Sequence, residues 1–333
     1  MRNLRPVSTI IIIVLAVSIL QVSGQITHTP IFDGESAYDF LTGQCDFGPR
    51  PPGSENLTLC TTYIVETLES FNWTVSTQNF TYRETACANI IATWNGTTDS
   101  PIILGAHYDT RPNATSDHLS NQSLPIMGAN DGASGTAVLM ELARILPPSD
   151  RSKVELVFFD AEDSGDLNGW NWIQGSTYYV SQLTTQRIET IEAMILADMV
   201  GDANLYLPKE SYSTDSLQNV IWSIAAELGY SSSFVDTPGG SVIDDHRPFL
   251  NAGIPSVDII QVPFPSYWHT LEDTPDKCTA ESLETVGEVL EVFIVQYDAE
   301  NGGFAPDPPY ILYATLIAIP IIILLVVYQQ KKR

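Results

Sequence analysis

Apolar positions along this chain follow two periodicities, one typical of strands and one typical of helices. Continuous apolar runs of strand length occupy Val154–Asp160, Glu192–Asp198 and Pro255–Gln261. Apolar and small residues recur at helical spacing in Gly135–Leu146, Ser216–Leu228 and Ala280–Tyr297. Strands that alternate with helices predict an α/β fold with three α/β/α layers, in which a mostly parallel, mixed sheet lies between the helices.

Acidic or imidazole side chains end five of the short segments along the chain. These segments are Ile102–Asp109, Gly128–Gly132, Val157–Asp163, Ile195–Asp198 and Tyr267–Thr270. In a parallel sheet the ligand site lies at the carboxyl ends of the strands, so we expect these side chains to meet there. One such residue alone is more often a strand-end cap or a satisfied core histidine. Five in succession favour a hydrolytic zinc site, which uses three His, Asp or Glu ligands and one open position.

Two of these segments suggest a division of roles. In the pair Glu162-Asp163, one carboxylate can face a metal ion while its neighbour faces the substrate and moves protons. In His107-Tyr108-Asp109, the carboxylate of Asp109 can orient the ligating imidazole from behind.

Both ends of the chain have the composition of membrane-targeting segments. Arg2 and Arg5 precede an apolar run, and small residues follow it, which predicts a signal peptide over residues 1–24. An uncleaved N-terminal anchor is the alternative, although the run is short for a membrane span. A catalytic domain is then expected over residues 25–300.

The C-terminal segment predicts a membrane anchor. Residues 301–309 contain Gly, Pro and Asp and are expected to form a linker, and residues 310–328 form an uncharged apolar run long enough to span a bilayer. The basic residues of 329–333 are expected to stay cytoplasmic. The protein is therefore predicted to be a single-pass protein of the cell membrane with an extracellular or lumenal catalytic domain.

Sequons and cysteines agree with export. Six Asn-X-Ser/Thr sequons begin at Asn56, Asn72, Asn79, Asn95, Asn113 and Asn121. Cys45, Cys60, Cys87 and Cys278 allow up to two disulfides, with the pairing open.

The charge of the chain excludes one class of partner. Its net charge is −25, from 40 acidic and 15 basic residues. Nucleic-acid binding needs a basic face, so no nucleic-acid partner is expected. The simplest interpretation of the acidic excess is solubility.

Several motifs together resemble one known family. They are Gly105–Asp109, Gly128–Gly135, Phe158–Asp163, Asp244–His246 and Trp268–Thr270. In order, spacing and flanking residues they resemble the zinc exopeptidase family that contains secreted aminopeptidases and glutaminyl cyclases, over roughly residues 35–297. The resemblance implies metal-ligand positions at His107, Asp131, Asp163, Asp198 and His269, with Asp131 bridging in two-zinc members. It also implies Glu162 as the general acid/base, whereas Asp163 departs from the Glu that the family more often has.

Two chemistries share the scaffold of that family. An aminopeptidase uses two zinc ions and a Glu-activated hydroxide to cleave the first peptide bond. A cyclase uses one zinc ion to polarise the side-chain amide of an N-terminal Gln, while a carboxylate moves the amine proton to the departing ammonia. The segments Pro263–His269 and Ile243–Phe249 resemble the cyclase branch. This implies Asp244 as the hydrogen-bonded partner of Glu162, and substrate contacts from Trp268, Phe264 and Ile243.

The resemblance therefore predicts a glutaminyl-peptide cyclotransferase, with a zinc-dependent aminopeptidase as the alternative. The cyclase would hold one Zn²⁺ on Asp131, Asp163 and His269, and the aminopeptidase a second on His107 and Asp198. The substrate would be the N-terminus of a peptide or protein. A non-catalytic ectodomain is a third interpretation, which the intact Glu162 and ligand set disfavour. The sequence leaves the oligomeric state open.

Overall fold

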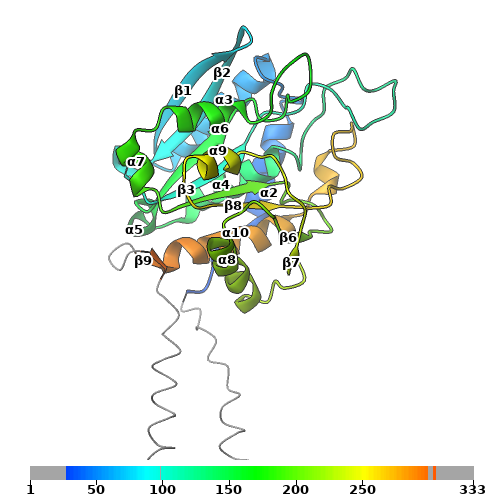
Figure 1. Cartoon of the computed structure of the whole chain (residues 1–333). Helices are drawn as coiled ribbons and strands as arrows, with labels where there is room; N and C mark the ends of the chain where they lie inside the picture. Colours follow the sequence, from blue (N-terminus) through cyan, green and yellow to red (C-terminus); the bar gives the residue numbers. More distant parts are fainter. Residues whose placement is uncertain (1–27, 98, 299–302, 305–333) are drawn as a thin grey trace, which may run out of the picture. The chain divides into compact units, whose positions relative to one another are not determined.

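A six-stranded sheet runs through the part of the chain that the computed structural model describes, residues 28–97, 99–298 and 303–304 (Figure 1). Its order is β1-β2-β4-β3-β5-β8. The strands are β1 (Thr74–Tyr82), β2 (Thr85–Thr93), β3 (Ile102–His107), β4 (Val154–Phe159), β5 (Ala193–Asp198) and β8 (Ser256–Ile260). The pairs β4-β3, β3-β5 and β5-β8 are parallel, whereas β2 is antiparallel to both β1 and β4. The predicted α/β class and the mostly parallel, mixed sheet are confirmed.

Helices pack on both faces of this sheet. They are α2 (Gly34–Cys45), α3 (Glu55–Ser70), α4 (Ala133–Ile145), α6 (Gln174–Ser181), α8 (Asp215–Glu227), α9 (His246–Asn251) and α10 (Ala280–Gln296). On one face α4 lies against β3 and β5, with α2, α3 and α10 packed on α4. On the other face α6 contacts β2, and α9 contacts β5 and β8.

Alternation along the strands accounts for the two faces. Val157 and Phe159 of β4 and Met194 and Leu196 of β5 are buried in one cluster, which also contains Phe249 of α9. The side chains between them point to the opposite face, because successive residues of a strand alternate. All six residues of β3, β4 and β5 are buried, as expected for parallel strands covered on both sides.

Shorter elements complete the described chain. They are η1 (Trp94–Gly96), α5 (Pro148–Arg151), α7 (Thr185–Thr190), β6 (Leu207–Lys209), β7 (Phe234–Pro238), η2 (Pro275–Lys277), β9 (Tyr297–Asp298) and β10 (Gly303–Phe304). The strand β10 pairs with β9, so part of the segment predicted as a linker forms a short strand. Residues His28–Phe304 form one compact unit by their contacts.

Some expectations concern residues outside the described part. The predicted signal peptide (1–24), membrane span (310–328) and basic tail (329–333) all lie there and stay predictions. Within the described residues, none of the helices has both the length and the apolar composition needed to cross a bilayer. The four cysteines lie within the described residues and are all buried and free, so neither of the two disulfides that the sequence allows is formed.

The close contact between α4 and β5 leads to a prediction about stability. A Cβ at Gly135 of α4 would lie 1.9 Å from the carbonyl oxygen of Ala197 in β5. Relief of this clash would require a shift of the whole helix or the whole strand, because both atoms belong to packed backbone. We expect Gly135→Ala to lower the free energy of unfolding by about 1–3 kcal/mol or more, as overpacking does. Urea unfolding measures this loss. The matched control is Gly43→Ala in α2, whose Cβ would meet only the hydroxyl end of the Tyr63 side chain. Equal stabilities of the two variants would contradict the packing argument.

Candidate metal centre and active site

Two groups of buried side chains at the carboxyl ends of the parallel strands have metal-ligand geometry. One group is His107, Asp131 and Asp198, and the other is Asp131, Asp163 and His269. In each group the ligand atoms lie within 4.8 Å of one another. The structure thus brings together all five ligand positions expected from the sequence, and Asp131 belongs to both groups.

Short distances join the members of each group through Asp131. His107 Nε2 lies 3.2 Å from Asp131 Oδ1 and 3.2 Å from Asp198 Oδ1. His269 Nε2 lies 3.4 Å from Asp131 Oδ2 and 3.1 Å from Asp163 Oδ1. One carboxylate that faces an imidazole through each oxygen has the geometry of a bridging ligand.

The backbone brings these ligands together because the strands end there. His107 and Asp198 are the last residues of β3 and β5, and Asp163 follows β4. Asp131 lies in the turn before α4, which needs Gly132 at φ 107°, where a Cβ would lie 2.5 Å from the carbonyl oxygen of Asp109. A glycine is the residue that permits this close approach.

Left-handed backbone occurs at three other positions of the site. Ala161, which precedes Glu162, has φ 62°, Met199, which follows Asp198, has φ 47°, and His269 itself has φ 57°. Such conformations cost about 1–3 kcal/mol each for residues other than glycine, and they cluster at functional sites. No local pattern of residues predicts these three conformations.

Two carboxylates behind the ligands hold the loops in position. Asp109 accepts hydrogen bonds from the backbone N–H of Glu162 (3.1 Å) and of Asp163 (3.3 Å), and its Oδ1 lies 3.6 Å from His107 Nδ1. The distance to His107 is longer than a hydrogen bond, and His107 Nδ1 has no hydrogen-bond partner, so the expected role of Asp109 in orienting the imidazole stays a prediction. Asp273, which the sequence analysis missed, accepts from the N–H of Asp131 (3.1 Å).

The electrostatics of the groups fit a divalent cation. Burial alone would lower the pKa of His269, but Asp163 and Asp131 outweigh it and raise this pKa to about 9. The acidic site thus stabilises positive charge, which the proton on His269 provides in the absence of a metal cation. Burial alone would raise the pKa of Asp131, yet its close contacts with the imidazoles of His107 and His269 bring this pKa below its usual range. The buried oxygens Asp131 Oδ2 and Asp163 Oδ2 accept no hydrogen bond. Carboxylate and imidazole donors in this number suit zinc.

Glu162 lies beside the ligand groups without belonging to either. Its side chain lines a cavity of about 280 Å³ together with Asp131 and Asp163. Burial raises the pKa of Glu162 well above its usual value, and the charges of Asp163 and Asp244 raise it further, against the opposing effect of His107. A carboxyl with a raised pKa next to metal ligands can accept and donate protons near neutral pH.

Asp244 lies just before α9 and lines the same cavity as Glu162 and Asp198. Its Oδ1 accepts a hydrogen bond from the backbone N–H of Asp245, and its charge interacts with those of Asp198 and Glu162. The hydrogen bond between Asp244 and Glu162 that the resemblance implies stays a prediction. Burial, followed by the charge of Asp198, raises the pKa of Asp244 to about 8. Asp244 is therefore part of the acidic surroundings of both Asp198 and Glu162.

Aromatic rings form one wall of the cavity. The rings of Trp268 and His269 stack with centroids 3.5 Å apart, and Phe264 stacks on Trp268 at 4.5 Å. Trp172 lies parallel to His269, with an interplanar angle of 9° and centroids 6.1 Å apart. Ile243 also lines the cavity but is 62% exposed, so it lies at the rim. The three residues expected to contact substrate are thus brought together.

Some site residues were not found from the sequence. Arg111, two residues after Asp109, forms an ion pair with Asp163. Its positive charge beside the His107–Asp109 motif was the feature of the sequence that could have indicated this contact. Val242 and Ile260 line the cavity as ordinary apolar residues of a loop and a strand end. Of the two tryptophans after Asp163, Trp172 lines the cavity, whereas Trp170 packs on Tyr82.

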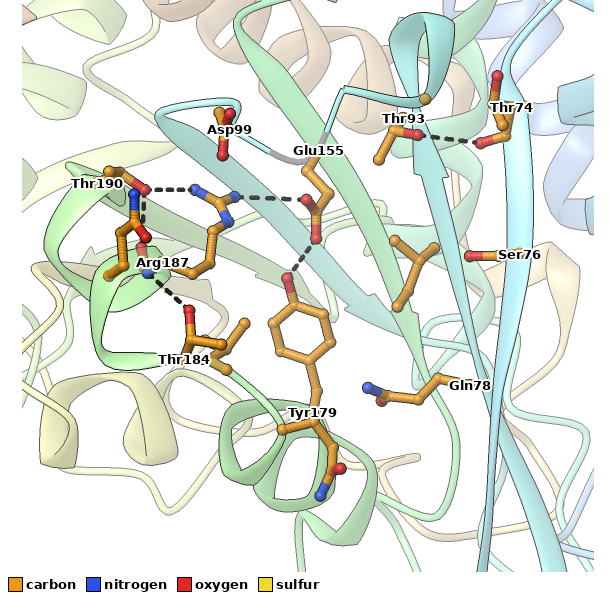
Figure 2. A pocket seen from close by; sticks show the side chains of 15 residues that line it. Thr74, Ser76, Gln78, Thr93, Asp99, Glu155, Tyr179, Thr184, Arg187 and Thr190 are labelled. Carbon is orange, nitrogen blue, oxygen red and sulfur yellow. Dashed lines mark hydrogen bonds and ion pairs between the residues drawn. The ribbon is translucent and has the colours of Figure 1, made fainter.

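A second, larger cavity of about 570 Å³ lies between the β1-β2 hairpin and the α6-α7 segment. Figure 2 shows Glu155 on its floor, between the hydroxyl of Tyr179 and the guanidinium of Arg187. Threonine, serine and glutamine side chains make up most of the remaining lining. Its buried carboxylate is thus already paired, unlike the open oxygens of the metal centre.

The raised pKa values predict how the metal-free protein responds to pH. Burial raises the pKa of Asp273 to about 7 and that of Asp244 to about 8. A carboxyl group whose pKa is raised by folding lowers the stability of the folded protein as pH rises from the unfolded pKa to the folded pKa. The pKa of His269 is raised to about 9, so protonated His269 stabilises the fold below its unfolded pKa and ceases to do so as pH rises.

We expect chelator-treated protein to melt at a lower temperature at about pH 8 than at about pH 5.5. Zinc should raise Tm more at the higher pH, because its ligands must be deprotonated. Thermal unfolding at both pH values checks this, and a higher apo Tm at pH 8 would contradict it.

The fold and this site are those of a zinc-dependent enzyme with an α/β fold. Comparison with known proteins identifies its family. The pattern of Peptidase family M28 matches residues 89–294. The chain belongs to that family, as the resemblance in its motifs predicted, and it is an enzyme of the cyclase or exopeptidase kind.

Individual relatives carry both activities in their names. The glutaminyl-peptide cyclotransferase of Bos taurus is 25% identical over 287 residues, which cover 74% of this chain and 78% of the relative. A Bacteroides thetaiotaomicron glutaminyl cyclase structure, bound to N-acetylhistamine, has a TM-score of 0.76 and 33% identity, covering 81% of this chain and 100% of its own. A Zn-dependent exopeptidase from Parabacteroides distasonis has a TM-score of 0.73 and 31% identity, covering 80% and 99%. The enzyme class and the zinc chemistry follow from these likenesses, and the choice of reaction does not.

Proposed function

We propose that this enzyme is a glutaminyl-peptide cyclotransferase, which converts the N-terminal Gln of peptides to pyroglutamate and releases ammonia. The observation that carries the proposal is the small cavity with Trp268 and Phe264 on one wall and Glu162 on another, directly against Asp131, Asp163 and His269. A glutaminyl side chain fits a pocket of about 280 Å³. The cyclase names among the relatives support the same choice.

The residues of the chain divide the work of cyclisation. Asp131, Asp163 and His269 would hold a zinc ion, which when bound polarises the side-chain amide carbonyl of the substrate. The rings of Trp268 and Phe264 pack against the glutaminyl methylenes and exclude water, which would otherwise hydrolyse the amide. Because these rings stack on one another and on His269, the pocket is held in place before substrate enters.

Glu162 carries the proton that the reaction moves. The α-amino nitrogen attacks the side-chain amide carbon and loses a proton to the Glu162 carboxylate. The bond between that carbon and the amide nitrogen then breaks, and Glu162 returns the proton to the leaving ammonia. The raised pKa of Glu162 suits a group that must first accept and then donate.

The alternative reaction is aminopeptidase hydrolysis. The observation in its favour is that both ligand groups are complete, with Asp131 shared by His107 and Asp198 on one side and by Asp163 and His269 on the other. Such an arrangement suits two zinc ions, and Glu162 would then take a proton from the attacking water.

One peptide distinguishes the two reactions. A peptide that begins with Gln gives a pyroglutamyl peptide and ammonia with a cyclase, but free glutamine and a shortened peptide with an aminopeptidase. We expect the first pair of products from zinc-loaded protein. Mass spectrometry of the products, with an ammonia assay on the same sample, is the measurement. Free glutamine as the main product would overturn the proposal.

We also propose that the enzyme acts outside the cytoplasm as a membrane-tethered protein. This rests on the apolar segments at 1–24 and 310–328 and on the sequons. Expression of the full chain, followed by membrane fractionation and protease protection, tests it. Recovery of the full-length chain in the soluble cytosolic fraction would contradict it.

A further inference from the structure

One cation lies in direct contact with the metal centre. Arg111 Nη1 lies 3.0 Å from Asp163 Oδ1, and both side chains are buried, with 5% and 1% exposure. The same nitrogen donates to the backbone carbonyl of Asp163 at 3.3 Å, and Nη2 donates to the carbonyl of Gly165 at 3.2 Å. The Nε of Arg111 donates to Thr115 Oγ1 at 2.9 Å. The guanidinium is therefore fixed on the loop that carries Asp163, with each of its three nitrogens bound.

An aromatic ring also packs on this guanidinium. Arg111 Cζ lies 4.7 Å from the centroid of the Trp172 ring, within the range of a cation–π contact. Trp172 in turn lies parallel to His269. Two ligands of the same group, Asp163 and His269, are thus linked through Arg111 and Trp172 as well as through the ion they would share.

The two oxygens of Asp163 differ because of this contact. Oδ1 accepts from Arg111 and faces His269, whereas Oδ2 is buried and accepts no hydrogen bond. The other ligand group is built differently, since no arginine or lysine of the described residues pairs with Asp198, whose ion-pair partner is His107. Arginine is suited to fixing a carboxylate because its planar donors set the angle of the group.

We propose that Arg111 is a positioning residue for zinc: by binding Asp163 Oδ1, it fixes the angle at which this carboxylate faces the ion that it would share with Asp131 and His269. Arg111 thereby holds the side chain of Asp163 at one angle. This side chain is shorter than the Glu that the family more often has at this position. The inference rests on the zinc chemistry of the proposed function but not on the choice between cyclase and aminopeptidase.

The test is zinc affinity in Arg111→Lys. Lysine keeps the positive charge, so the electrostatic effect on a divalent cation stays nearly constant while the fixed donors are lost. Outer contacts of metal ligands are typically worth 10–100-fold in affinity, and we expect the zinc dissociation constant to rise by about that factor. Competition with a chromophoric chelator measures it. Excess zinc should restore activity, which a merely misfolded variant would not show.

Arg187→Lys is the matched control. Arg187 is another largely buried arginine paired with a carboxylate, its Nη2 being 3.4 Å from Glu155 Oε2 in the second cavity (Figure 2). We expect this variant to bind zinc as the parent does. If Arg111→Lys does not fold, Thr115→Val removes one hydrogen bond to Arg111 and should weaken zinc binding to a lesser degree. Unchanged or tighter zinc binding in the folded variant would overturn the proposal, whichever reaction the enzyme catalyses.

Discussion

Replacing Glu162 by Gln is expected to lower kcat by about 10²–10⁴-fold, the range for loss of a general acid/base. The amide has the shape of the carboxylate but cannot accept and return a proton. Zinc content should stay at the parent value, because Glu162 belongs to neither ligand group. Steady-state kinetics with metal analysis of the same preparation measures both quantities.

The matched control for this loss is Glu155→Gln. Glu155 is also a buried glutamate whose pKa burial raises, and it hydrogen-bonds Tyr179 in the second cavity (Figure 2). We expect it to affect stability and to leave kcat close to the parent value. A Glu162→Gln variant with kcat within about tenfold of the parent would remove Glu162 from the chemistry.

Asp131→Asn is expected to abolish activity by removing the ligand that both groups share. Asn keeps the volume but not the negative charge, so neither group retains its full set of donors. A bound metal supplies several kcal/mol of transition-state stabilisation, which corresponds to a loss of at least about 10³-fold in kcat/KM. Zinc content by metal analysis should fall together with activity.

A comparison with Asp198→Asn sharpens this prediction. Asp198 belongs only to the group with His107, so the cyclase mechanism predicts that zinc remains on Asp131, Asp163 and His269 in that variant. The exposed carboxylate of Asp39 in α2 serves as a neutral control through Asp39→Asn. Retention of full zinc and activity in Asp131→Asn would contradict the bridging geometry.

The parallel core of the fold was predictable because its signal is local. The strands β4, β5 and β8 are continuous apolar runs, and both ends of each lie within one residue of the expected bounds. The helices α4, α8 and α10 also lie within two residues of expectation. By contrast, β1 reads Thr-Val-Ser-Thr-Gln-Asn-Phe-Thr-Tyr and is an edge strand with much of its surface exposed, so it lacks an apolar run. Its strand character comes from pairing with β2, which no local pattern encodes.

The clustering of the five candidate ligands was predictable for a related reason. A polar residue directly after a buried strand stands out from the apolar pattern, and parallel strands bring such residues to the same edge of the sheet. Contacts between side chains of different loops could not be predicted from the sequence. Arg111 reaches Asp163 only because the loops after β3 and β4 meet, and Asp244 lines the same cavity as Asp198 because the segment before α9 returns to the end of β5. Partners of this kind depend on tertiary geometry and not on spacing along the chain.

One paired measurement on zinc-loaded protein distinguishes the two reactions most directly. Peptides that begin with Gln and with Leu are incubated with the same preparation, in which zinc per chain is counted. Cyclisation through Asp131, Asp163 and His269 predicts pyroglutamyl product from the Gln peptide, an intact Leu peptide and full activity at one zinc per chain. Release of leucine, with activity that requires a second zinc on His107 and Asp198, would contradict it.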